Sequence, residues 1–129
     1  MLKIRHEQNA VLEEAARLKF EDETVAHLTE FFPEQCAALG EDGTRDAIRL
    51  GVSRGMLHGI TFEQDLRIYI RLMFIFGREF DTDGQIPWAG MILNDPALPL
   101  SGQKIRQLYL TAIDYLKHLA EQEENGDKG

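Results

Sequence analysis

The sequence predicts an all-α protein, a compact single-domain bundle of about five helices around a central apolar helix at residues 62–76. Apolar residues recur at steps of three and four along most of the 129 residues, which is helical periodicity. No run of alternating β-branched residues indicates a strand. Glycine, proline and capping residues separate the periodic segments by short connections. The length suits one domain, which we place at residues 1–120, followed by an acidic, flexible tail at 121–129.

The first segment runs from about Glu7 to Phe32. The charged residues between its apolar positions, Glu21 among them, are predicted to form a solvated face. Pro33 ends or restarts the helix because proline lacks an amide hydrogen, and a short turn at 34–39 is expected to follow. The apolar stripe of this segment consists of Val11, Ala15, Leu18, Val25, Leu28 and Phe32.

The second segment begins near Asp42 or Thr44, both suitable N-caps, and runs to about Leu57. Gly51 and Gly55 lie one turn apart on one face of this helix. A glycine inside a helix costs about 1 kcal/mol relative to alanine. The pair therefore predicts that another backbone packs closely there, and the alternative is a helix of low intrinsic stability.

The third segment opens with the clearest local signal in the chain. Thr61 and Gln64 match a capping box, in which Thr61 is the N-cap and Gln64 reaches back to it. The second half of the segment at 62–76 is apolar nearly all round, so we predict that it is the central buried helix. Gly77 suits the position just after the helix, because glycine readily adopts the left-handed conformation found there.

Two further helices complete the predicted bundle. After a loop, Pro87 opens a short helix that runs to about Asn94. A second loop leads to the last segment, with Ser101 as its N-cap and an end near Glu121. The main apolar stripe of the last segment consists of Ile105, Leu108, Ala112, Tyr115 and Leu119, with Tyr109, Ile113 and Leu116 beside it.

The charge balance argues against two classes of partner. With 14 basic and 22 acidic residues the formal net charge is −8, whereas nucleic acids and anionic membranes attract clustered lysine and arginine. We therefore expect no nucleic acid and no membrane as partners. The longest apolar run, at 68–76, is interrupted by Arg71 and is far shorter than a membrane span. Cys36 is the only cysteine, and the first residues lack the apolar stretch of a secretory signal, so we expect a cytoplasmic protein.

No catalytic motif is present, and we expect a protein without enzymatic activity, cofactor or metal. Asp81 and Asp83 with Gly84 resemble the start of a calcium loop, but the glycine comes too early and Ile92 stands where the bidentate glutamate belongs. We interpret the pattern as a turn whose aspartates cap their own backbone. The four histidines lack metal-site spacing, and Cys36 lacks the cationic neighbours that make a thiol reactive.

Two features are candidates for binding another protein. Arg67 and Arg71 form the only polar stripe of the third segment, where they either pair with acidic residues of other helices or hold an acidic group of a partner. Trp88, expected to form an apolar knot with Phe80 and Ile86, either plugs one end of the bundle or anchors a partner. The candidate protein-binding residues are Phe80, Asp81, Asp83, Ile86, Pro87, Trp88, Arg67 and Arg71.

A series of short motifs extends over most of the chain, from Ile4 to Leu116. The pattern resembles a group of small bacterial proteins that are encoded beside type VI secretion spike, PAAR-repeat and effector genes. The resemblance implies an accessory role and carries over no catalytic residues. The motifs are Ile4-Arg5-His6-Glu7-Gln8, Val25-Ala26-His27-Leu28, Phe32-Pro33-Glu34-Gln35-Cys36, Gly59-Ile60-Thr61, Asp65, Leu72-Met73-Phe74, Gly77, Phe80-Asp81-Thr82-Asp83, Ile86-Pro87-Trp88-Ala89 and Ile92-Leu93-Asn94-Asp95.

The sequence leads to three functional hypotheses. The first is a cytoplasmic adaptor or chaperone-like protein that binds a type VI secretion effector, PAAR or spike protein. The second is an immunity protein that neutralises a cognate toxin with its acidic surface. The third is a small enzyme or metal-binding protein. A homodimer is compatible with all three, because the stripes of the first and last helices are wide enough to contact a second chain.

Overall fold

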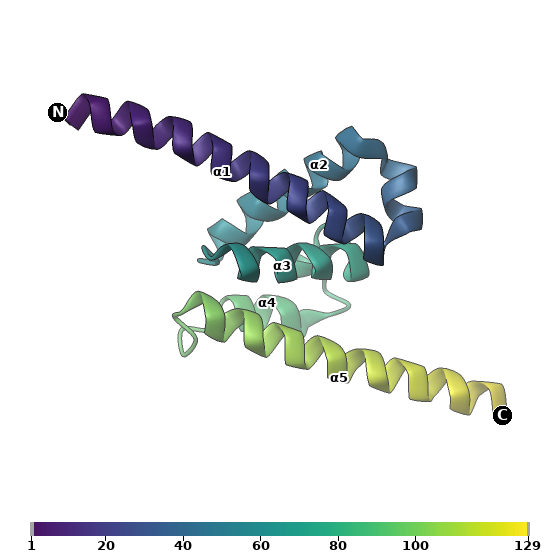
Figure 1. The fold of residues 1–129 in the computed structure, drawn as a ribbon. Coiled ribbons are helices and arrows are strands. Elements are labelled where there is room, and N and C mark those ends of the chain that lie inside the picture. The colour runs from purple at the N-terminus through teal and green to yellow at the C-terminus, as the bar shows by residue number, and fades with distance from the viewer. Residues whose placement is uncertain (1, 129) are drawn as a thin grey trace.

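A computed structural model describes the backbone of residues 2–128 and the side chains of residues 14–124, and this part of the chain is all-α, as predicted. Figure 1 shows α3 in the middle, with α1 and α2 on one side and α4 and α5 on the other. The start of α1 and the end of α5 project in opposite directions. The elements are α1 (Leu2–Phe31), α2 (Pro33–Leu57), α3 (Glu63–Phe76), the 3-10 turn η1 (Phe80–Thr82), α4 (Pro87–Leu93) and α5 (Ser101–Lys128).

The central position of α3 confirms the prediction made from its apolar composition. It packs against α1, α2, η1 and α5, and Tyr69 and Ile70 at its middle are fully buried. Gly77 follows the helix with a positive φ of 115° and donates its amide hydrogen to the Met73 carbonyl. The apolar core residues contributed by α3 are Leu66, Tyr69, Ile70, Leu72, Met73 and Phe74.

The two glycines of α2 lie directly against α3. A Cβ atom on Gly51 would lie 2.5 Å from Cγ1 of Ile70 and 2.9 Å from Sδ of Met73. One on Gly55 would lie 2.7 Å from Cδ2 of Leu66. The glycines do mark a close contact with another helix, but the predicted contact with its backbone is wrong, because side chains of α3 fill the space. The absence of a Cβ at these positions allows the two helices to approach.

The turn expected at residues 34–39 is wrong, because α2 already begins at Pro33. Proline suits the first helical position, where the missing amide hydrogen breaks no hydrogen bond. The break comes instead at Gly40, whose φ of 74° and ψ of 174° kink the helix. Beyond the kink, the buried Thr44 hydroxyl donates to the Gly40 carbonyl at 2.8 Å and helps to restart the helix.

The capping box predicted at Thr61 does not form. The residue before α3 is Phe62, and no side chain caps this helix. A tertiary contact takes its place: the Ser101 hydroxyl donates to the buried Asp65 carboxylate at 2.9 Å and accepts the Thr61 amide hydrogen at 3.4 Å. Ser101 is therefore the first residue of α5 rather than its cap, and it ties the start of α5 to the start of α3.

The buried face of α1 differs from the predicted stripe. Leu18 is exposed, whereas Glu21, expected on the solvated face, is 2% exposed. The spacing of the residues that are buried is also helical, so periodicity alone could not choose between the two faces. The side chain of Val11 lies outside the described residues. The buried side chains of α1 are Phe20, Glu21, Thr24 and Leu28.

α5 continues as a helix through Lys128, beyond its predicted end near Glu121. The acidic segment at 121–129, expected to be a flexible tail, is therefore helical as far as it is described. Within the described residues we find no helix whose length and apolar content would let it cross a bilayer.

Candidate protein-binding surface

The loop between α3 and α4 turns most of its predicted binding residues inward. Phe80 and Ile86 are buried, and the Phe80 ring packs on Tyr69 with ring centroids 5.0 Å apart. Close approach of α4 fixes the loop, because a Cβ on Gly90 would lie 2.9 Å from the Asp81 carbonyl oxygen. Of the predicted loop residues only Pro87 is exposed; Phe80, Asp81 and Ile86 are buried, and Asp83 and Trp88 are half-buried.

Asp81 anchors this loop to α2. Its side chain is 3% exposed and accepts two hydrogen bonds from Arg54, 2.6 Å from Nη2 and 3.2 Å from Nε. His58 Nε2 lies 2.9 Å from the same carboxylate. Burial on its own would raise the pKa of the Asp81 carboxyl, but the hydrogen bonds from Arg54 and His58 outweigh it and hold that pKa below its ordinary value.

Tyr69 lies beside this ion-paired cluster. Its hydroxyl is buried and makes no hydrogen bond to the described residues, and its ring lies 6.3 Å from the His58 ring. Burial, followed by the nearby Asp81 carboxylate, raises the pKa of the Tyr69 phenol well above its ordinary value. The phenol therefore stays neutral at physiological pH, and its role in the described fold is packing.

Asp83 and Trp88 also serve the fold. The Asp83 carboxylate accepts the Gln85 amide hydrogen at 2.8 Å, the self-capping turn expected from the sequence. Trp88 makes its aromatic contacts with residues of other helices rather than with Phe80, whose ring packs on Tyr69. The Trp88 ring packs edge-on against Phe76 at 5.5 Å and against Tyr115 at 5.7 Å. Trp88 therefore joins α4 to the end of α3 and to α5.

Arg67 and Arg71 have different surroundings, although they are one turn apart on α3. Arg67 pairs with Glu23 and lies 5.2 Å above the Phe20 ring, so it is held by α1. Arg71 is half-buried and forms no ion pair with the described residues. No hydrogen bond or ion pair among the described residues connects either arginine to the loop before α4, so the predicted binding residues do not form one site.

A large groove of the described surface lies between α1, the end of α2 and the start of α3. We call it the α1–α2–α3 groove; its volume is about 790 Å³. Met56 lines it and is 56% exposed, and Leu57 and Phe62 beside the following turn are 83% and 65% exposed. The lining residues are Ala16, Arg17, Phe20, Glu21, Ile48, Arg49, Val52, Ser53, Met56, Thr61, Glu63 and Leu66.

A buried charge cluster stiffens one wall of this groove. The Glu21 carboxylate lies 3.1 Å from Arg49, 3.3 Å from Arg17 and 3.6 Å from Arg45. Because Glu21 is almost fully buried, these contacts compensate the loss of its hydration. They also fix α1 against α2, and the exposed faces of Arg17 and Arg49 remain at the rim of the groove.

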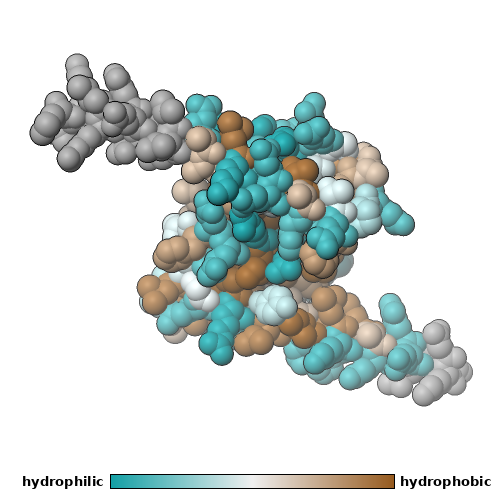
Figure 2. Space-filling model, in the orientation of Figure 1, coloured by the Kyte–Doolittle hydropathy of each residue, from teal (hydrophilic) through white to brown (hydrophobic). Residues whose placement is uncertain are grey.

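A second, smaller groove of about 290 Å³ runs between the end of α1, α3 and α5, and we call it the α3–α5 groove. Figure 2 shows hydrophobic surface in the channel between α1 and α5 and along α5. Three of the residues that line the α3–α5 groove are exposed, namely Phe31, Ile75 and Tyr109. Its lining residues are Phe31, Phe32, Ile68, Arg71, Leu72, Ile75, Tyr109 and Ile113.

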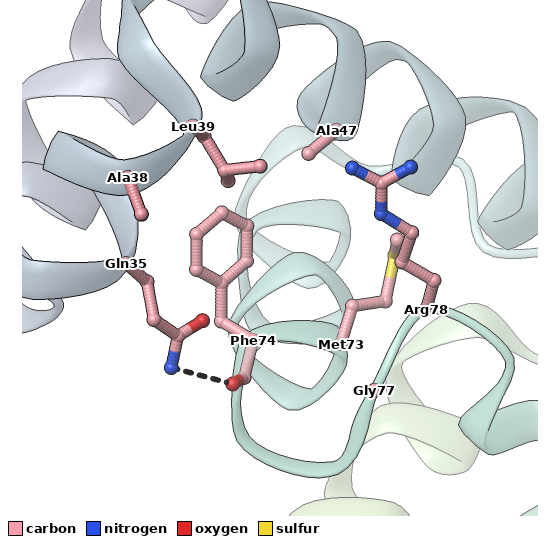
Figure 3. A pocket seen from close by; sticks show the side chains of 8 residues that line it. All are labelled: Gln35, Ala38, Leu39, Ala47, Met73, Phe74, Gly77 and Arg78. Carbon is pink, nitrogen blue, oxygen red and sulfur yellow. Dashed lines mark hydrogen bonds between the residues drawn. The ribbon is translucent and has the colours of Figure 1, made fainter.

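The kink in α2 creates a third cavity, of about 330 Å³. Figure 3 shows the Phe74 ring below Leu39, between the two parts of α2, with Arg78 at the far side. Gln35 donates to the Phe74 carbonyl at 3.1 Å, which ties the first part of α2 to the end of α3. This volume is at the lower end of the range of ligand pockets, and the polar groups that line it are few.

The described residues contain no group of three histidine, cysteine or acidic side chains placed to hold a metal ion. Cys36 is buried near the start of α2. Comparison of the chain with models of known protein families, with curated proteins and with solved structures gives no match.

Sequence reasoning missed the exposed apolar residues that flank the turn at His58 and Gly59. Met56 and Leu57 end α2, and Phe62 precedes α3. A signal for them exists in the sequence, because a turn between helices lies at the surface, and large apolar residues on both sides of it stand out. We call Met56, Leu57 and Phe62 the apolar rim.

Proposed function

We propose that this protein is a non-enzymatic accessory protein that binds an effector, PAAR or spike protein of a bacterial type VI secretion system in the cytoplasm. The observation that carries the binding role is the apolar rim next to the α1–α2–α3 groove. The assignment to secretion rests on the sequence resemblance. One of its motifs, at 59–61, lies in the turn between Met56 and Phe62.

The groove and its rim have the properties of a site for an apolar segment of a partner. Exposed large apolar residues that lie together mark interaction surfaces, and methionine adapts its unbranched side chain to different partners. Arg17, Arg49 and Glu63 lie among the lining residues, so the partner segment is expected to carry polar residues beside its apolar anchor. The net charge of −8 favours approach of a basic partner.

Co-purification with the proteins encoded by neighbouring genes tests this proposal. The tagged protein is co-expressed with each spike, PAAR and effector protein in turn, and we expect one of them to co-purify in stoichiometric amount. The variant Met56→Glu should lose that partner, because the charge enters an apolar contact. Met91→Glu on α4 is the matched control, since Met91 is 71% exposed and lies outside the groove. If none of the neighbouring proteins co-purifies, the proposal fails.

The acidic surface favours one alternative, an immunity protein that occludes the active site of a basic toxin. The two roles differ in a growth assay. When the neighbouring effector is expressed as an active toxin, an immunity protein restores growth, whereas an adaptor binds the effector and leaves the toxicity unchanged. Restored growth that is lost in Met56→Glu would replace the adaptor role by the immunity role at the same groove.

A further inference from the structure

Beyond Tyr115, which packs on Phe76 and Trp88, α5 contributes no buried side chain among the described residues. The last buried residue of this helix is Ala112, and every described side chain from Ile113 to Glu124 is half-buried or exposed. Helices in water derive most of their stability from packing of an apolar face, and a free extension is marginal. Leu116 and Leu119 are nevertheless exposed apolar residues in this part, which indicates that another molecule covers it.

Four exposed or half-buried residues of α5 form a regular stripe. Tyr109, Ile113, Leu116 and Ala120 follow one another at steps of four, three and four residues, the spacing with which one helix packs along another. We call these four residues the α5 stripe. Tyr109 and Ile113 also line the α3–α5 groove. The groove and the α5 stripe are therefore one continuous apolar surface, which extends from the body of the protein along the projecting end of α5.

The charges at the two ends of this surface are opposite. Arg71 lies in the groove without an ion-pair partner among the described residues, and Arg106 precedes the α5 stripe. At the other end α5 carries Glu121, Glu123 and Glu124. A surface that is apolar in the middle, basic at one end and acidic at the other is complementary to itself under a twofold rotation, as isologous dimers require.

We propose that two copies of this protein associate through an antiparallel pair of α5 helices seated along their α3–α5 grooves. With Ile113 of one copy opposite Leu116 of the other, Tyr109 lies opposite Ala120 and Arg106 lies opposite Glu123. This register repeats on both sides of the twofold axis, so each ion pair occurs twice. From residue 106 to residue 123 the contact extends about 25 Å along the helix at 1.5 Å per residue.

Sedimentation equilibrium of the full chain tests this association. The wild type is expected to be a dimer at micromolar concentration, and Leu116→Glu to raise the dimer dissociation constant at least tenfold. Leu110→Glu is the matched control, because Leu110 is an exposed leucine of the same helix on a different face, and it should remain a dimer. Helical circular dichroism verifies that each variant folds. A wild type that stays monomeric at 100 micromolar overturns the proposal, as does an equal effect of both variants.

A charge exchange tests the antiparallel register. Arg106→Glu should weaken the dimer, because it places a glutamate opposite Glu123, and so should Glu123→Arg. The double variant should regain the wild-type dissociation constant to within about threefold. Failure of the double variant to recover overturns the register. A third outcome is that the wild type is monomeric and that Leu116→Glu loses a secretion partner. This outcome would assign the α5 stripe to that partner and overturn the dimer. The adaptor role is tested separately at Met56, which lies in the other groove.

Discussion

The loop before α4 and the apolar rim differ in how their prominent residues are used. The loop carries phenylalanine, aspartate and tryptophan, residue types common at binding hot spots, yet Phe80 and Asp81 are buried and Trp88 packs on its neighbours. The rim carries Met56 and Leu57, ordinary core residues, and leaves them exposed. Composition therefore does not distinguish a structural segment from a binding surface here. Exposure does distinguish them, and it is the reason why we propose the rim, rather than the loop, as the partner-binding surface.

The largest expected effect concerns the buried anchor of the loop. Asp81→Asn removes the charge that compensates Arg54, and breaking a buried ion pair by removing one partner costs about 3 kcal/mol or more. We therefore expect the free energy of unfolding, measured by urea denaturation, to fall by about this amount. Asp83→Asn is the control, since Asn can still accept the Gln85 amide hydrogen, and should change it by less than about 0.5 kcal/mol. Equal effects of the two variants would contradict the structural role of Asp81.

The second-largest expected effect on stability concerns the contact between α2 and α3, which supports both the loop before α4 and the apolar rim. Gly51→Ala places a Cβ 2.5 Å from Cγ1 of Ile70. Overpacking of this kind costs about 1–3 kcal/mol, and the higher helix propensity of alanine offsets about 1 kcal/mol of it. We therefore expect a net loss of unfolding free energy of up to about 2 kcal/mol. Gly102→Ala in α5 meets no heavy atom within 4 Å and is predicted to be neutral or slightly stabilising. Thermal denaturation of Gly51→Ala and Gly102→Ala measures the two changes in stability.

A smaller, graded effect is expected with pH. The pKa of Asp81 is lowered in the folded protein, so its ionised form stabilises the fold above the unfolded pKa of about 3.9, and this stability is lost as the pH falls through the folded pKa. The difference in unfolding free energy between the wild type and Asp81→Asn should therefore be greatest near neutral pH and shrink at acidic pH. A difference that stays constant from pH 7 to pH 3 would show that folding does not lower the pKa of Asp81.

The fold was largely predictable because the apolar periodicity of α2, α3 and α5 follows their buried faces. The errors have physical causes. The buried Glu21 contacts Arg45 and Arg49 of α2 in addition to Arg17 of its own helix, and sequence spacing does not reveal the two contacts from α2. The capping box predicted at Thr61 does not form, and the Thr61 amide instead donates a hydrogen bond to the hydroxyl of Ser101, which is distant in sequence. The break in α2 lies at Gly40 rather than in the turn predicted at residues 34–39. Gly40 adopts a positive φ because of how the chain packs in three dimensions, which residue spacing does not show.

The binding surface was much less predictable. Of the eight predicted residues, Arg71 lines the α3–α5 groove, and Phe80 and Asp83 line a cavity of about 480 Å³ beside the loop. Asp81 instead forms an ion pair with Arg54 within the chain. Aromatic and charged residues near a proline indicate a binding loop and a structural plug equally well, and only burial separates the two. The exposure of Met56 and Phe62 depends on how α2 and α3 meet at the turn between them, and no periodicity encodes that angle.

The central claim, that the apolar rim and not the loop before α4 binds the partner, is tested most directly by one titration. The dissociation constant of the co-purified secretion partner is measured by calorimetry for the wild type, Met56→Glu and Pro87→Glu. Pro87 is the exposed residue of the loop segment and opens α4, where a glutamate is well tolerated near a helix N-terminus. We predict a dissociation constant at least about tenfold higher for Met56→Glu, corresponding to 1.4 kcal/mol, and within about twofold of the wild type for Pro87→Glu. Weakened binding in Pro87→Glu with unchanged binding in Met56→Glu would contradict the account.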